Sequence, residues 1–184
     1  AGAGCGFFST LLSGIPGVAE VYAMDACANQ VELLMSRVVE ALRRPSDAPV
    51  TGCVGEFARI GLPDESVDAI FDFYSLHHAP DLGAVFQEFR RVLRPDGVIV
   101  CLDKARANRL DDAALDALLD VEYTKEAKQK MGVDPAVRLT RRMNGEREFR
   151  LKDWQRLAEG AGLAVTHLHV AKTVSRHAPV RWMK

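Results

Sequence analysis

The 184-residue chain lacks an excess of charge of either sign, since 24 Lys and Arg residues stand against 25 Asp and Glu residues, for a net charge of −1. Without a strong positive charge it has no general attraction for nucleic acid or an anionic membrane surface, so we expect neither as a partner. No apolar run approaches the roughly 18 residues of a membrane span, and no charged-then-apolar signal opens the sequence. These absences favour a soluble, cytoplasmic protein.

Cysteine is also scarce. The four cysteines are widely spread and form no C-x-x-C pair: Cys5, Cys27, Cys53 and Cys101. This spacing lacks the usual thiolate metal and redox motifs, so we expect reduced, mostly buried cysteines that act as small apolar residues. His167 and His169 share one face of an expected late strand, and we interpret them as solvated rather than as ligands. We therefore predict no metal site.

Glycine is concentrated at the start of the chain. Gly2, Gly4 and Gly6 alternate and lead directly into an apolar run. Such a turn joins a strand to a helix, and the unpaired N–H groups at a helix start can bind a polar or anionic group. The same glycines can serve packing alone. A dinucleotide site of the form G-x-G-x-x-G would need glycine at position 7, where Phe7 stands, so a nicotinamide oxidoreductase is disfavoured.

Further along the chain, expected strands alternate with expected helices. Strands are predicted over 18–25, 50–54, 67–74 and 98–102, and helices over 29–42, 82–93 and 154–162. The strands are almost continuously apolar, as in a parallel sheet covered on both faces. We predict an α/β fold, a Rossmann-like, doubly wound and mostly parallel sheet. Two last strands, over 163–170 and 179–183, are expected to form an antiparallel pair.

Ligands bind at the carboxyl ends of strands in such sheets. Asp25 ends the first predicted strand, 25 − 4 = 21 residues after Gly4. A carboxylate there can accept both hydroxyls of a ribose, and the alternative is that it caps the next helix. Asn29, with Glu32 three residues on, is expected to form a capping box for that helix.

Several short blocks together resemble one family. They are the G-x-G-x-G turn of 2–6, GLPDESVDAIF over 61–71, LHH over 76–78, and FQEFRRVLRPDG over 86–97. This combination resembles the small-molecule branch of class I S-adenosylmethionine (SAM) dependent methyltransferases, which includes the ubiquinone and menaquinone biosynthesis enzymes. The resemblance covers about residues 1–104, and 154–170 more weakly.

The resemblance implies that the chain transfers the methyl group of SAM to a small-molecule acceptor by direct in-line displacement. It also implies the cofactor contacts, namely the turn of Gly2, Gly4 and Gly6, the ribose site at Asp25 and Ala26, and the adenine site at Glu56 and Phe57. The alternative is a methyltransferase-like interaction subunit without catalysis.

Asp72 departs from the family, which has a small residue there. Its carboxylate either meets the SAM ammonium group or is paired within the protein. His77 and His78 either pack the loop or orient and deprotonate the acceptor.

We expect residues 1–184 to form one domain, with a polar helical insert or lid over about 104–150. Five arginines of this insert either are solvated or gather an anionic substrate: Arg138, Arg141, Arg142, Arg147 and Arg150. The family's first central strand is absent from this sequence. Losing its buried side chains removes about as much as a domain's whole stability of about 5–15 kcal/mol, so we expect residues 1–184 not to fold cooperatively alone.

Overall fold

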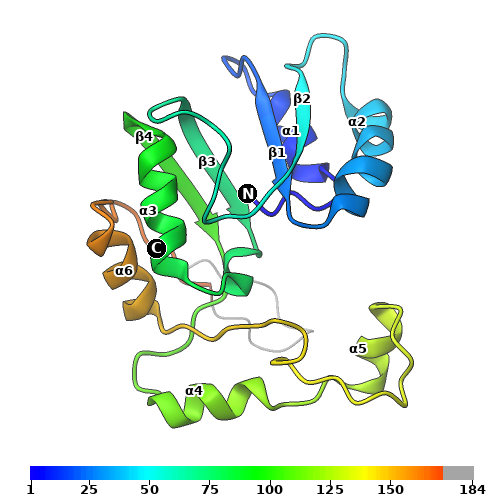
Figure 1. Cartoon of the computed structure of the whole chain (residues 1–184), viewed down its shortest axis with the longest axis vertical. Coiled ribbons are helices and arrows are strands. Elements are labelled where there is room, and N and C mark those ends of the chain that lie inside the picture. The colour runs from blue at the N-terminus through cyan, green and yellow to red at the C-terminus, as the bar shows by residue number, and fades with distance from the viewer. Residues whose placement is uncertain (172–184) are drawn as a thin grey trace.

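Two pairs of parallel strands lie at the centre of the structure, a computed structural model that describes residues 1–171 (Figure 1). β1 (Val21–Asp25) pairs with β2 (Val50–Val54), and β3 (Val67–Phe73) pairs with β4 (Leu93–Leu102). The parallel pairing confirms the predicted strand direction. In the part of the chain that the structure describes, no ladder joins the two pairs.

Helices follow the strands in the predicted alternation. They are α1 (Phe7–Ser13), the π-helix η1 (Gln30–Met35), α2 (Ser36–Leu42), the 3-10 helix η2 (Leu76–His78), α3 (Leu82–Val92), α4 (Asp112–Leu119), α5 (Lys125–Lys130) and α6 (Leu151–Gly160). Among residues 1–171, none of the helices has the length and apolar character needed to cross a bilayer.

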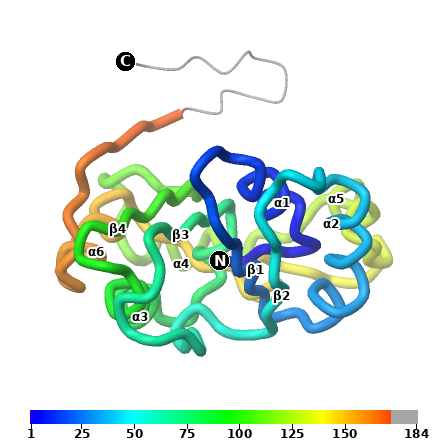
Figure 2. The backbone as a smooth tube through the Cα atoms, turned by 90° about the horizontal axis from the view of Figure 1, so that it is seen from above, coloured from blue at the N-terminus to red at the C-terminus, as the bar shows by residue number. Residues whose placement is uncertain are grey.

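The first residues of the chain connect the two strand pairs, and both figures of the whole chain place the N-terminus between β1 and β3 (Figures 1 and 2). The Ala1 amine donates to the carbonyl oxygen of Phe71 on β3 at 2.7 Å, and the Ala3 N–H donates to that of Met24 on β1 at 2.8 Å. Phe8 of α1 adds an aromatic contact to β3, with its ring centroid 4.3 Å from that of Phe73.

The main core lies under α3. The apolar stripe of this helix is buried against β3, β4 and α6 through Leu82, Val85, Phe86, Phe89 and Val92. Asp81 caps the helix as predicted, because its Oδ1 accepts the N–H of Ala84 at 3.0 Å. This packing buries Ile70 in the middle of β3 and Leu93 at the start of β4.

The second predicted helix differs from expectation at its start. Asn29 has helical dihedral angles and caps nothing with its side chain, so the predicted capping box is wrong. The helix already begins at Ala28, and the chain entering it is held by Asp25, which accepts the N–H of Cys27. Across η1 and α2 only Met35 is buried.

The sheet is not covered on both faces. Val98, Val100 and Leu102 on β4 are about half exposed, because α3 and α6 pack on the other side of this strand. The cysteines are not buried either: Cys5 and Cys53 are intermediate, and Cys27 and Cys101 are exposed. They lie in turns or on incompletely covered strands.

The predicted strand over 163–170 is not formed, because no neighbouring segment among residues 1–171 provides a ladder for it. The predicted strand over 179–183 lies outside the described residues.

An ion pair on α3 makes stability depend on pH. Glu88 accepts hydrogen bonds from Arg91 at 2.7 Å and from the N–H of Ile60 at 2.6 Å. The Arg91 bond lowers the pKa of Glu88 below its ordinary 4.5. A depressed folded pKa contributes stability above 4.5 that is lost as the pH falls through the folded value.

We predict that Glu88→Gln lowers the melting temperature of the intact protein at pH 7 by about 2–4 °C, as expected for one lost charge-assisted hydrogen bond in a domain of this size. The gap between variant and parent should narrow as the pH falls below 4.5. Thermal unfolding followed by circular dichroism measures it, and a gap that stays constant from pH 7 to pH 3 would contradict this origin.

Candidate functional site

The glycine turn before α1 packs against neighbouring side chains and also leaves part of its backbone open to a ligand. Gly2, Gly4 and Gly6 all have positive φ, at 60°, 52° and 83°, which favours glycine. A Cβ on Gly2 would lie 2.1 Å from Ser75 Oγ, and one on Gly6 would lie 2.7 Å from Met35 Cγ. A Cβ on Gly4 would meet nothing within 4 Å. Gly2 and Gly6 are therefore required by internal packing, whereas Gly4 turns its backbone to open space.

Asp25 lies against this turn, at the end of β1. Its Oδ2 accepts the N–H of Gly4 at 2.7 Å, and its Oδ1 accepts the N–H of Cys27 at 2.8 Å. The carboxylate thus stabilises the turn toward the next helix, through Ala26, and is fixed beside Gly4. Each carboxylate oxygen has a second lone pair, so Asp25 can still accept a hydroxyl group.

Asp72 is fully buried on β3. Burial raises the pKa of its carboxyl group, and the charge of Asp103 adds to this shift. The carboxyl accepts hydrogen bonds from Ser75 Oγ and from Cys101 Sγ, the latter at 3.3 Å. Of the two roles predicted for Asp72, pairing within the protein is the one present in this structure. Through Ser75 it supports the packing of Gly2.

The two residues after β2 lie differently. Phe57 is partly buried against the core, and its ring lies 3.4 Å from the position of a Cβ on Gly2. Glu56 is exposed, and its backbone forms an isolated bridge with Arg59. The structure therefore brings Phe57, but not the Glu56 side chain, to the glycine turn.

His77 is the buried histidine of the pair, with a side chain 1% exposed. Its Nδ1 lies 2.6 Å from Asp103 Oδ1, and its backbone N–H donates to Asp103 Oδ2 at 3.0 Å. On the other side of the ring, Nε2 lies 3.8 Å from Glu146 Oε2. His77 is therefore held between two carboxylates just beyond the ends of β3 and β4.

His78 is exposed, and its Nδ1 lies 3.2 Å from the carbonyl oxygen of Gly145. Desolvation, with the neighbouring His77, lowers its pKa, so the ring is neutral at pH 7. Our sequence interpretation missed Asp103 and Glu146. An acid at the end of a strand, the signal that identified Asp25, also marks Asp103. Nothing in the sequence marks Glu146, which lies in an insert turn.

A network of ion pairs ties the insert to the end of β4. Glu148, whose side chain is 1% exposed, pairs with Arg106, Arg141 and Lys104, and Glu146 pairs with Lys104 and Arg141. Burial alone would raise the pKa of Glu146, but hydrogen bonds from Lys104 and Tyr123 lower it to about 2. Both acids are thus ionised within a cluster of cations.

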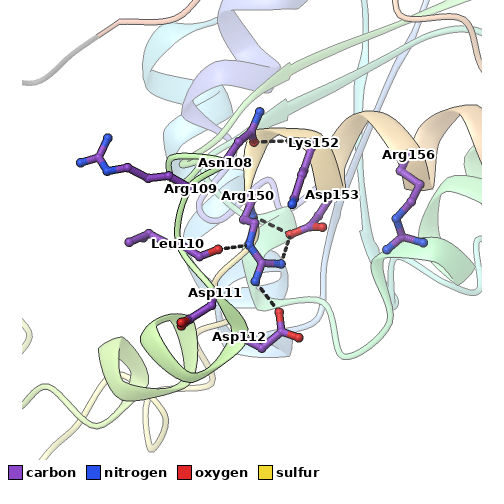
Figure 3. A pocket seen from close by; sticks show the side chains of 9 residues that line it. All are labelled: Asn108, Arg109, Leu110, Asp111, Asp112, Arg150, Lys152, Asp153 and Arg156. Carbon is purple, nitrogen blue, oxygen red and sulfur yellow. Dashed lines mark hydrogen bonds and ion pairs between the residues drawn. The ribbon is translucent and has the colours of Figure 1, made fainter.

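The other insert arginines are mostly paired as well. Arg142 binds Asp116 and Asp120. Arg150 lies in a hollow where the start of α4 meets the start of α6, and it binds Asp112, Asp153 and the carbonyl of Leu110 (Figure 3). Apart from Arg150, this hollow contains none of the residues predicted for the site. Arg141, Arg142 and Arg150 are therefore neither simply solvated nor free to gather an anion.

Comparisons with known proteins show the family to which the chain belongs. The methyltransferase domain family matches residues 1–101, which is more than half of the chain. The chain belongs to this family. The fold is shared with the YcgJ protein of Bacillus subtilis, which aligns with a TM-score of 0.66 at 24% identity, over 94% of this chain and 65% of that one.

Two curated relatives match shorter stretches of this methyltransferase-family chain. The ubiquinone/menaquinone biosynthesis C-methyltransferase UbiE of Caulobacter vibrioides is 32% identical over 82 residues, which cover 45% of this chain and 32% of the relative. The malonyl-[acyl-carrier protein] O-methyltransferase of Yersinia pestis is 45% identical over 47 residues, covering 26% of this chain and 18% of the relative. The matches thus span a third or less of either relative.

The ion-pair network yields a prediction about the insert. Glu148→Gln removes a buried charge and leaves Arg106, Arg141 and Lys104 short of a partner, a change that typically costs about 3–5 kcal/mol. We expect faster amide hydrogen exchange over 104–150, with α3 unchanged, measured by mass spectrometry on the intact protein. Asp116→Asn, at an exposed ion pair, is the matched control and should change little. Equal exchange in both variants would contradict the network's role.

Proposed function

We propose that this protein transfers the methyl group of SAM to a small-molecule acceptor by direct in-line displacement. Membership of the methyltransferase domain family supports the reaction class. The observation that carries the proposal is the placement of Asp25 against the N–H of Gly4, at 2.7 Å, at the carboxyl end of a parallel strand. Two curated relatives with different acceptors in their names are both called methyltransferases, which supports the broad class of reaction.

The residues present fit the cofactor. The backbone at Gly4 faces open space, and Asp25 keeps lone pairs for the ribose hydroxyls. We assign the base end to Phe57, which lies near the turn, and to the exposed Glu56 before it, and the support of the turn to Gly2, Gly6 and Asp72. When bound, SAM supplies an electrophilic methyl group on a sulfonium centre. The protein's own contribution is alignment, which is worth up to about 7–11 kcal/mol in well-oriented reactions.

We assign the orientation and deprotonation of the acceptor to the histidine pair. Asp103 fixes the orientation of His77 and favours a proton on Nδ1, so that Nε2 is the atom free to accept a proton. His78 lies beside it, with ring centroids 4.3 Å apart, and can help to orient the acceptor.

We further propose that residues 104–150 act as the lid that excludes water, because their ion-pair network closes directly over His77 through Glu146. The alternative of a non-catalytic docking subunit has less support. Much of the insert's charge, which such a docking surface would use, is paired internally.

Asp25→Ala tests the cofactor assignment. We expect SAM affinity to fall at least tenfold, about 1.4 kcal/mol, because up to two hydroxyl hydrogen bonds are lost. The SAM affinity of Asp25→Asn should lie between those of Asp25→Ala and the parent, since its amide oxygen still accepts a hydrogen bond. Isothermal titration calorimetry on the intact protein measures both, with melting temperatures recorded to detect loss of the Gly4 and Cys27 contacts. Unchanged affinity in a folded Asp25→Ala protein would refute the ribose assignment.

His77→Ala tests the acceptor side. Turnover should fall by about 10²–10⁴-fold if Nε2 accepts a proton, while the dissociation constant of SAM stays within a factor of two or so. The control is His167→Ala, at an exposed histidine outside this cluster. Single-turnover rates with saturating SAM separate the two effects. Near-normal rates in His77→Ala would show that the residue only packs the loop.

A further inference from the structure

We propose that His77, His78 and Glu146 form a binding site for a divalent transition-metal ion of the Zn²⁺ class. Each of the three residues offers one ligand atom, and these atoms all lie within 4.8 Å of one another. Two imidazoles and one carboxylate are a common ligand set for such ions, and three protein ligands leave a coordination position open.

Both imidazole rings are already oriented as metal-binding histidines are. A ligating ring usually donates its second N–H to a carboxylate or a backbone carbonyl, which fixes the tautomer. Nδ1 of His77 faces Asp103 Oδ1 at 2.6 Å, and Nδ1 of His78 faces the Gly145 carbonyl oxygen at 3.2 Å. With protons on these two atoms, each Nε2 keeps its lone pair for a cation.

The environment of His77 Nε2 is unusual without a cation. With the proton on Nδ1, Nε2 can only accept, and it faces the Glu146 carboxylate, 3.8 Å away, which also only accepts. A cation between the two atoms resolves this conflict.

Glu146 can be released to serve as a ligand. Its Oε1 accepts from Tyr123 at 2.6 Å, and its Oε2, the atom facing His77, is now paired with the Lys104 ammonium group and, at 3.1 Å, with Arg141 Nη2. The Lys104 ammonium group also lies 3.5 Å from Glu148 Oε1, and Arg141 Nη2 pairs with that same oxygen. A bound ion can therefore displace both cations onto Glu148 without leaving a buried charge unpaired.

This inference goes beyond methyl transfer, because ion binding needs neither SAM nor an acceptor. With an ion bound, His77 Nε2 is a ligand and no longer the proton acceptor; the ion would instead lower the pKa of an acceptor hydroxyl group at its open coordination position, and the proton would pass to water. Imidazole ligands favour Zn²⁺ and Co²⁺ over Mg²⁺, which prefers oxygen ligands.

The test is calorimetric titration of Zn²⁺ into the intact, chelator-stripped protein without SAM. We expect one ion per chain, and at least tenfold weaker binding by His78→Ala, an exposed position whose replacement leaves the core intact. Glu146→Gln should weaken binding similarly. The control is the double variant His167→Ala and His169→Ala, which removes two exposed histidines and should bind as the parent does.

Co²⁺ absorption provides the second measurement, because nitrogen and oxygen ligands give visible bands without thiolate charge transfer. Absence of saturable binding, equal affinity in His78→Ala and the parent, or a thiolate band would each overturn the proposal. Loss of methyl transfer with intact Zn²⁺ binding would instead count against the proposed function alone.

Discussion

The site depends on a carboxylate that accepts backbone N–H groups just where a parallel strand ends. Asp25 binds the amides of Gly4 and Cys27, and so connects the glycine turn, β1 and the following helix in one place. The three segments lie close together. Hydrogen bonds to one fixed carboxylate offset part of the conformational entropy that is lost when their backbone becomes ordered. The Gly4 backbone can face open space because Asp25 holds the turn in place from its other side.

The same device appears a second time at the end of β4. Asp103 accepts hydrogen bonds from the backbone N–H groups of His77 and Lys104, and its carboxylate also binds Nδ1 of the His77 ring. The two acids thus fix two loops, one at the glycine turn after β1 and one at the insert after β4.

Local chemistry explains how far the sequence could predict this structure. Strand runs such as 50–54, the Asp81 cap and the Asp25 position depend on neighbouring residues, and all three were predictable. The Asn29 cap failed because Asp25 had already organised the preceding turn. The pairing of Glu146 and Glu148 with Lys104 and Arg106 joins residues about forty positions apart, and no periodicity or spacing encodes such a pairing. The uncovered face of β4 was not predictable either, because the apolar content of a strand shows which residues can be buried but not whether another element covers them.

The connection between the two strand pairs has a mechanical consequence. The half with β1 and β2 carries Asp25, and the half with β3 and β4 carries His77. Between β1 and β3 lie the hydrogen bonds of Ala1 and Ala3 and the ring of Phe8. These few contacts therefore link the half proposed to hold SAM to the half proposed to hold the acceptor, and they set the distance between the two parts of the proposed site.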